Sequence, residues 1–177
     1  MRLTPSTPAC QAIIQNAYHV RDVDEAVERF HALWGIGPFI MRRRLALEDV
    51  RYHGTPSTLS LSAAHAQIGD LQIELVQQHG DEPSAFRDMF AAHEEGLHHM
   101  AILPADHDAM VAWYAKLGFP AATELTTREG RGATYVDTRP MLGHMIEVYR
   151  PNESLLAFYR MVEEAARDGA GQLKVEL

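Results

Sequence analysis

With 177 residues, 46% of them hydrophobic and 23% charged, the chain has the composition of an ordinary globular protein that buries a sizeable core. Its formal net charge of −8 argues against a nucleic-acid backbone or an acidic membrane surface as the main partner. A single cysteine, Cys10, excludes an internal disulfide, and no apolar run reaches the roughly 20 residues that cross a bilayer, so we expect a cytoplasmic location.

The first half of the chain predicts one compact unit. Two prolines and small polar residues predict a loose N-terminal arm over residues 1–12. β-branched and apolar residues predict a strand at 13–20, and Asp22 is expected to cap a helix that runs to about Leu33. Glycine and proline end this helix, and turn signals separate the strands that follow, near 39–46, 59–68 and 70–77. The first module therefore spans 13–78.

The second half repeats this order. A polar connection over 79–95, with a short helix from Ser84, leads to a second module over 96–150. Its predicted elements are a strand at 97–103, a helix at 106–117 and strands near 121–126, 131–137 and 144–149. A final amphipathic helix within 151–177 lies outside the repeat, and it either covers the sheet or joins a partner subunit.

The repeat itself can be aligned residue by residue. Residues 15–30 (QNAYHVRDVDEAVERF) align without a gap with 99–114 (HMAILPADHDAMVAWY), and QIELV at 72–76 matches MIEVY at 145–149. Gln15 thus corresponds to His99, and Glu74 corresponds to Glu147. The two modules supply one amide, one imidazole and two carboxylates at equivalent places.

These four side chains fit one metal ion. Strand alternation allows them to share a surface if the two half-sheets curve and meet. A glutamate between Ile73 and Leu75 is costly inside a sheet unless something neutralises its charge, and a divalent cation does so. A mixed nitrogen and oxygen site suits Zn, Ni, Co, Mn or Fe without distinguishing among them.

The motifs around these residues resemble the vicinal oxygen chelate superfamily, which includes glyoxalase I, methylmalonyl-CoA epimerase, extradiol dioxygenases and bleomycin-resistance proteins. The resemblance covers about residues 13–150 and is carried by QNAYHVRDVDEAV, GDLQIELVQ, EGLHHMAI and GHMIEVYRP. It implies an α+β fold in which paired βαβββ modules form a cupped mixed sheet around one metal, and a homodimer. Its ligands fall on Gln15, Glu74, His99 and Glu147. Glutamine at the first position is similar to one branch of glyoxalase I.

Other polar residues have weaker assignments. His19 shares the strand face of Gln15, so it is a possible pocket residue or a structural one, and Met145 and Tyr149 either line the cup or pack in the core. Alternation turns His98 away from His99. The remaining histidines considered lack repeat partners and are interpreted as surface or loop residues: His53, His65, His79 and His144. The cluster Arg42-Arg43-Arg44 is interpreted as a solvated strand or turn.

The favoured function is a metal-dependent isomerase, lyase or epimerase that acts on a carbonyl substrate through a metal-stabilised enolate. The resemblance to glyoxalase I favours Glu147 as the main base and Glu74 as its counterpart. Two alternatives stay open: an extradiol-type Fe(II) dioxygenase, against which Gln15 and Glu74 argue, and a non-catalytic binding protein of the resistance type. Glutathione hemithioacetals, acyl-CoA thioesters and small aromatic intermediates all remain possible substrates.

Overall fold

A computed structural model of the chain describes residues 9–169 and 172–177, so most of the predicted arm at 1–12 lies outside the described residues. The helices in the described ranges are α1 (Val23–Trp34), α2 (His107–Lys116), α3 (Arg139–Leu142) and α4 (Glu153–Asp168). The strands are β1 (Gln15–His19), β2 (Phe39–Arg42), β3 (Leu47–Tyr52), β4 (Thr55–Pro56), β5 (Leu61–Ile68), β6 (Leu71–Gln78), β7 (Gly96–Ile102), β8 (Ala121–Thr127), β9 (Gly132–Val136), β10 (Met145–Arg150) and β11 (Lys174–Glu176).

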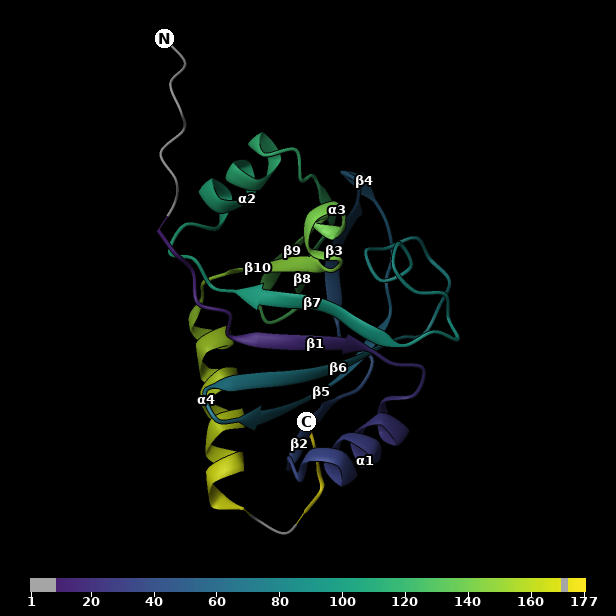
Figure 1. The fold of residues 1–177 in the computed structure, drawn as a ribbon, viewed down its shortest axis with the longest axis vertical. Helices are drawn as coiled ribbons and strands as arrows, with labels where there is room; N and C mark the ends of the chain where they lie inside the picture. Colours follow the sequence, from purple (N-terminus) through teal and green to yellow (C-terminus); the bar gives the residue numbers. More distant parts are fainter. Residues whose placement is uncertain (1–8, 170–171) are drawn as a thin grey trace.

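All of these strands form one curved sheet in the order β11-β2-β5-β6-β1-β7-β10-β9-β8-β3-β4 (Figure 1). The first module supplies β2-β5-β6-β1 and the second supplies β7-β10-β9-β8, and they join where β1 pairs antiparallel with β7. β1 also pairs parallel with β6, and β7 pairs parallel with β10. The predicted α+β fold, with two βαβββ units in a cupped mixed sheet and a C-terminal helix, is confirmed.

The strand register places corresponding residues of the two modules symmetrically about the junction of β1 and β7. Gln15 lies opposite Ala101 across the central pair, and Ala17 lies opposite His99. Ala17 is also level with Glu74 on β6, as Ala101 is level with Glu147 on β10. Equivalent residues of the two modules therefore occupy equivalent places about the junction of β1 and β7.

The helix that follows β1 begins and ends as the sequence predicts. The side chain of Asp22 accepts hydrogen bonds from the backbone N–H groups of Asp24 and Glu25, at 2.9 and 3.0 Å. Gly35 ends α1 in the left-handed conformation with φ of 68°, which glycine adopts without steric cost.

The structure differs from the prediction between β2 and β5. The expected strand near 39–46 ends at Arg42, and the chain continues into β3 and β4, which the sequence did not predict. β3 leaves its own module and pairs antiparallel with β8 of the second one. Most of the side chains of β3 are not buried, so its sequence lacks the alternation that marks a strand. Its pairing partner is also distant along the chain.

The connection over 79–95 contains turns and no regular helix, contrary to the helix expected from Ser84. The backbone of Ala85 explains the difference, because its polar groups are bound to other parts of the chain. Its N–H donates to Thr123 Oγ1 at 2.8 Å, and its carbonyl lies 3.0 Å from His98 Nε2. In an α-helix that carbonyl would accept a hydrogen bond from the N–H of Met89, four residues along the chain. The N–H of Met89 bonds to the carbonyl of Phe86 instead.

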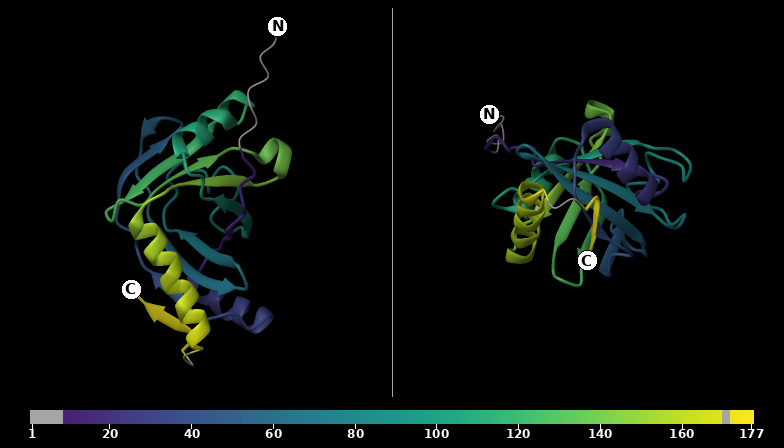
Figure 2. Two further views of the ribbon diagram at one scale, coloured as in Figure 1. Left: turned by 90° about the vertical axis from the view of Figure 1, so that its left-hand side faces the viewer. Right: turned by 90° about the horizontal axis from the view of Figure 1, so that it is seen from below.

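The helices cover both faces of the sheet. α1 packs with Ile73 and Leu75, and α2 packs near Ile146 and Val148, so both lie on the convex face, opposite the two glutamates. α4 crosses the concave side beside β2 and β5, where Phe158 packs against the first module (Figure 2). The helix outside the repeat therefore covers the sheet. Within the described ranges, no helix is both long and apolar enough to cross a bilayer.

Candidate metal centre and cavity

Three of the four predicted ligands meet on the concave face. Glu74 comes from β6, His99 from β7 and Glu147 from β10, and one ligand atom from each lies within 4.8 Å of the others. His99 Nε2 is 3.0 Å from Glu147 Oε2 and 3.4 Å from Glu74 Oε2. All three residues are buried. The repeat thus brings one imidazole and two carboxylates from three strands to one point.

The facing atoms of this group form no regular hydrogen bond. Glu74 Oε2, His99 Nε2 and Glu147 Oε2 are all buried without a hydrogen-bond partner of normal geometry, although their distances allow electrostatic attraction. Buried polar atoms in proteins are nearly always satisfied, so such a group calls for an explanation. Lone pairs directed at a common point, rather than at each other, are the arrangement that a divalent cation requires. The donor set fits the predicted metal.

The charges of the site are strongly coupled. Burial by itself disfavours protonated His99, but the attraction of Glu147 and Glu74 outweighs it and raises the pKa of His99 to about 9. Burial likewise disfavours ionised Glu74, and its interactions with His65 and His99 outweigh that effect and lower the pKa of Glu74. Without a cation, the imidazolium of His99 is the group that compensates the buried carboxylates.

A chain of hydrogen bonds sets the orientation of His99. The carbonyl of Ala85 is only an acceptor, so His98 Nε2, 3.0 Å away, must carry a hydrogen. Burial and the charge of His99 lower the pKa of His98 well below its ordinary value, so its Nδ1 is a bare acceptor. His99 Nδ1 lies 2.8 Å from that atom and donates to it. Neutral His99 therefore carries its hydrogen on Nδ1 and directs the Nε2 lone pair at the two glutamates.

The contact between His98 and His99 contradicts the simple alternation expected from the sequence. Ala17 pairs with His99 and Tyr18 pairs with Leu97, so His98 is the extra residue of a β-bulge. The bulge brings the two imidazole rings together, and the Phe86 ring stacks on the His98 ring with 4.2 Å between the ring centres. His98 is hydrogen-bonded and buried, and it supports His99 directly.

Gln15 is buried on the concave face of the sheet, where Glu74, His99 and Glu147 meet. Its amide nitrogen donates to Gln72 Oε1 at 2.7 Å, and its oxygen accepts from the Tyr149 hydroxyl at 3.1 Å. The amide is thus oriented by two neighbours. Its oxygen keeps a second lone pair, so this oxygen is the atom that would serve as a fourth ligand.

The three possible pocket residues have different surroundings. Tyr149 lines the cavity described below. Met145 is buried in an apolar cluster with Phe86 and Tyr135. His19 is buried with its ring nitrogens 3.0 Å from the Glu94 carbonyl oxygen and 3.1 Å from Arg87 Nη1, so it is held by the connection between the modules. Neither His19 nor Met145 is among the described residues that line the cavity.

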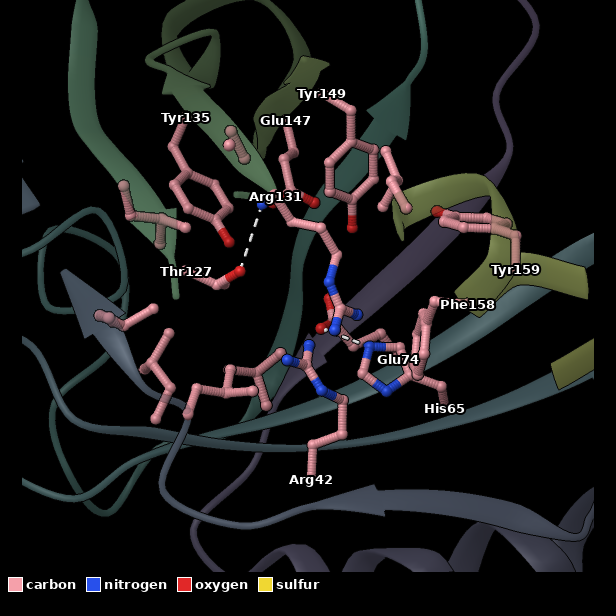
Figure 3. Close-up of a pocket in the computed structure, with 18 residues that line it drawn as sticks. Arg42, His65, Glu74, Thr127, Arg131, Tyr135, Glu147, Tyr149, Phe158 and Tyr159 are labelled. Atoms are coloured by element: carbon pink, nitrogen blue, oxygen red, sulfur yellow. Dashed lines mark hydrogen bonds and ion pairs between the residues drawn. The ribbon is translucent and has the colours of Figure 1, made fainter. Parts of the chain in front are cut away.

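A cavity of about 590 Å³, including its open mouth, begins at the two glutamates and is closed on one side by α4 (Figure 3). α4 contributes Leu155, Phe158 and Tyr159 to the cavity wall. Three hydroxyl groups face it from Tyr135, Tyr149 and Tyr159. Burial, and then the negative charge of Glu147, raise the pKa of each tyrosine well above its ordinary value, so the hydroxyls stay neutral. The space is largely apolar with a few polar groups, as small-molecule sites usually are.

The sequence profile of the glyoxalase/bleomycin resistance protein/dioxygenase superfamily matches residues 14–136. The chain belongs to this superfamily. No curated protein matches it significantly in sequence.

Solved structures of similar fold agree with this membership. Methylmalonyl-CoA epimerase from Mycobacterium tuberculosis is 17% identical, with a TM-score of 0.54 over 82% of this chain and 91% of the epimerase. A hypothetical protein from Bacillus halodurans is 17% identical, with a TM-score of 0.56 over 81% and 96% of the two chains. A Streptomyces coelicolor methylmalonyl-CoA epimerase in complex with 2-nitronate-propionyl-CoA is 20% identical, with a TM-score of 0.51 over 77% and 94%. At these identities the likeness establishes the fold.

In this superfamily member, two interpretations of the sequence are wrong. His65 is buried and its Nε2 lies 3.0 Å from Glu74 Oε1, so it is neither a surface nor a loop residue. A signal for it existed: the two-residue turn at 69–70 pairs Ile68 with Leu71, and counting back along both strands places His65 opposite Glu74. Arg42 also enters the cavity, whereas its neighbour Arg43 binds acidic residues on the outside.

Proposed function

We propose that this protein is a metal-dependent isomerase, lyase or epimerase that acts on a small carbonyl compound. In this proposal Glu74, His99 and Glu147 hold one divalent cation, and Gln15 supplies a fourth ligand. The observation that carries it is the convergence of three buried ligand atoms that make no regular hydrogen bonds to each other. The fold shared with methylmalonyl-CoA epimerases is compatible with this class of reaction.

A cation in this site would supply Lewis-acid stabilisation of the negative charge that develops on a substrate oxygen when an adjacent proton leaves. The chain supplies the group that takes the proton. Glu147 lies at the cavity wall and is proposed as the main base, with Glu74 as its counterpart. The contact with His65 supports this division, because it lowers the pKa of Glu74 and so weakens that carboxylate as a proton acceptor.

The surroundings support proton transfer rather than ligand storage alone. Neutral hydroxyls of Tyr135 and Tyr159 can donate hydrogen bonds to substrate oxygens while the apolar wall excludes water. Carboxylates from the two modules approach the ligand site from opposite sides of the central strand pair. A proton removed by one carboxylate can therefore be returned by the same group or by the other.

The test begins with metal analysis of the purified protein, followed by titration of the stripped protein with divalent cations. Exchange of the substrate α-proton for deuterium, followed by NMR, then reports proton abstraction for a panel of hemithioacetals, acyl-CoA thioesters and 2-oxo acids. Glu147→Gln should retain the fold and lose about 10²- to 10⁴-fold in exchange rate, the usual contribution of a general base. Glu164→Gln, the same change at an exposed position of α4, should have no effect.

The outcomes separate the alternatives. Near-normal exchange in Glu147→Gln would refute the assignment of the base. A protein that binds no divalent cation would favour a non-catalytic binding role. Oxygen uptake with catechols after loading with Fe(II) would favour a dioxygenase. The predicted homodimer is tested separately by light scattering.

A further inference from the structure

Two arginines enter the cavity from different modules and meet at one aromatic ring. Arg42 is the last residue of β2, and Arg131 directly precedes β9. Their guanidinium carbons lie 5.3 and 5.0 Å from the centre of the Phe158 ring on α4. Each side chain is only 14% exposed. Figure 3 shows both guanidinium groups directed into the cavity, near Glu74 and His65.

These guanidinium groups have unused hydrogen-bond donors. Arg131 Nε and Nη1 are buried without a partner, and no side-chain hydrogen bond from Arg42 is formed within the described ranges. Among the residues that the structure describes, the only carboxylate in ion-pair contact with them is that of Glu129, which lies 3.5 Å from one nitrogen of each arginine and remains 45% exposed. A guanidinium offers five N–H donors, so most of the donor capacity of the pair is free.

The charges also leave the pair uncompensated. Burial and the charge of Arg131 both lower the pKa of Arg42, which shows that the two cations disfavour each other, yet an arginine stays protonated in proteins. With a divalent cation bound, the charges of Glu74 and Glu147 are balanced by the metal. Arg42 and Arg131 then face Glu129 alone, and one positive charge remains. A monoanion balances it.

We propose that Arg42 and Arg131 form an anion-binding subsite, and that the substrate is a carbonyl compound that also carries a carboxylate. A carboxylate fits better than a phosphate because its single charge matches the remaining one and its two oxygens suit the planar guanidinium donors. The inference rests on the proposed function, since it assigns the metal to one end of the ligand and the arginines to the other.

The subsite is tested with probes that bind zinc through a hydroxamate. Benzohydroxamate carries the chelating end alone, and its 3- and 4-carboxy derivatives are compared with the matching carbamoyl derivatives, which have nearly the same shape and no charge. Calorimetry on the zinc-loaded protein gives the affinities. At least one carboxy probe should bind about tenfold to a hundredfold more tightly than its carbamoyl partner, as expected for hydrogen bonds between charged groups.

Variants then test whether Arg42 and Arg131 cause the preference for the carboxy probe over its carbamoyl partner. Arg42→Met and Arg131→Met should each abolish the preference for the carboxy probe, while benzohydroxamate still binds in a zinc-dependent way. The matched controls Arg43→Met and Arg128→Met remove the same charge from exposed residues and should preserve it. Equal affinities for acid and amide in the unmodified protein, which requires no variant, would overturn the subsite. So would an equal loss of preference in the controls. Benzohydroxamate binding that does not depend on zinc would instead refute the metal centre, while the acid–amide comparison still reports on the arginines.

Discussion

The titration of His99 gives a quantitative prediction for the metal-free protein. Its pKa is about 9 in the folded state, against an ordinary value of 6.5 in the unfolded chain. Between these values the folded protein holds one proton more than the unfolded chain, so the free energy of unfolding falls by about 1.4 kcal/mol for each pH unit. The stabilisation is complete below pH 6.5 and is lost as the pH rises through about 9. The total loss is about 3 kcal/mol.

Urea denaturation of EDTA-treated protein at several pH values between 6 and 10 measures this loss. His99→Gln is the comparison, because it keeps a polar side chain in the site and removes the titration. The quantity that matters is the difference between the two proteins, since groups outside the site contribute equally to both. If the stability of the variant falls with pH as steeply as that of the unmodified protein, the imidazolium of His99 does not compensate the carboxylates and the electrostatic reasoning is wrong.

The same proton has the opposite effect on metal binding. A cation must displace the hydrogen from Nε2, so its affinity should rise about tenfold for each pH unit below about 9 and then level off. Calorimetric titration with zinc in two buffers of different ionisation enthalpy should find about one proton released per metal at pH 7. No proton release at pH 7 would contradict the raised pKa of His99.

Substitutions at three positions test other parts of the site. His98→Leu should weaken metal binding about 10- to 100-fold by releasing the ring of His99. His98→Asn should retain much of the affinity, because the asparagine oxygen can replace Nδ1 as acceptor. Equal metal affinities in titrations of the two variants would contradict the hydrogen-bond chain from Ala85 through His98 to His99. His65→Leu should destabilise the metal-free protein by about 1–3 kcal/mol in urea denaturation by leaving Glu74 Oε1 without its partner, and zinc should reduce the difference. Phe86→Ala should lower the free energy of unfolding by about 3–5 kcal/mol, because the ring is fully buried; a loss below 1 kcal/mol would be inconsistent with its packing.

Much of the fold could be predicted because the chain contains its pattern twice. A single strand with Glu74 is ambiguous, but a second strand with Glu147 at the matching place fixes both the unit and its symmetry. β3 escaped prediction for the opposite reason. It has no counterpart in the second module, and few of its side chains are buried. Its partner β8 belongs to the other module and is distant along the chain. Pairings between distant segments leave little trace in local sequence.

The site shows the same division between repeated and unrepeated residues. The repeat identified Glu74, His99 and Glu147, whereas His65 and Arg42 have no equivalent of their own type and were interpreted as surface residues. His98 was misplaced because a β-bulge interrupts the alternation on which its direction was based. A bulge depends on how two strands meet, which no single strand records.

The two modules are alike in backbone and unlike around the ligand. His65 and Tyr135 occupy matching positions, opposite Glu74 and Glu147 respectively, and α4 packs chiefly against β2 and β5 of the first module. A molecule turned by half a revolution in the cavity would therefore exchange an imidazole for a phenol. Handedness toward a ligand thus originates in the parts of the chain that break the repeat.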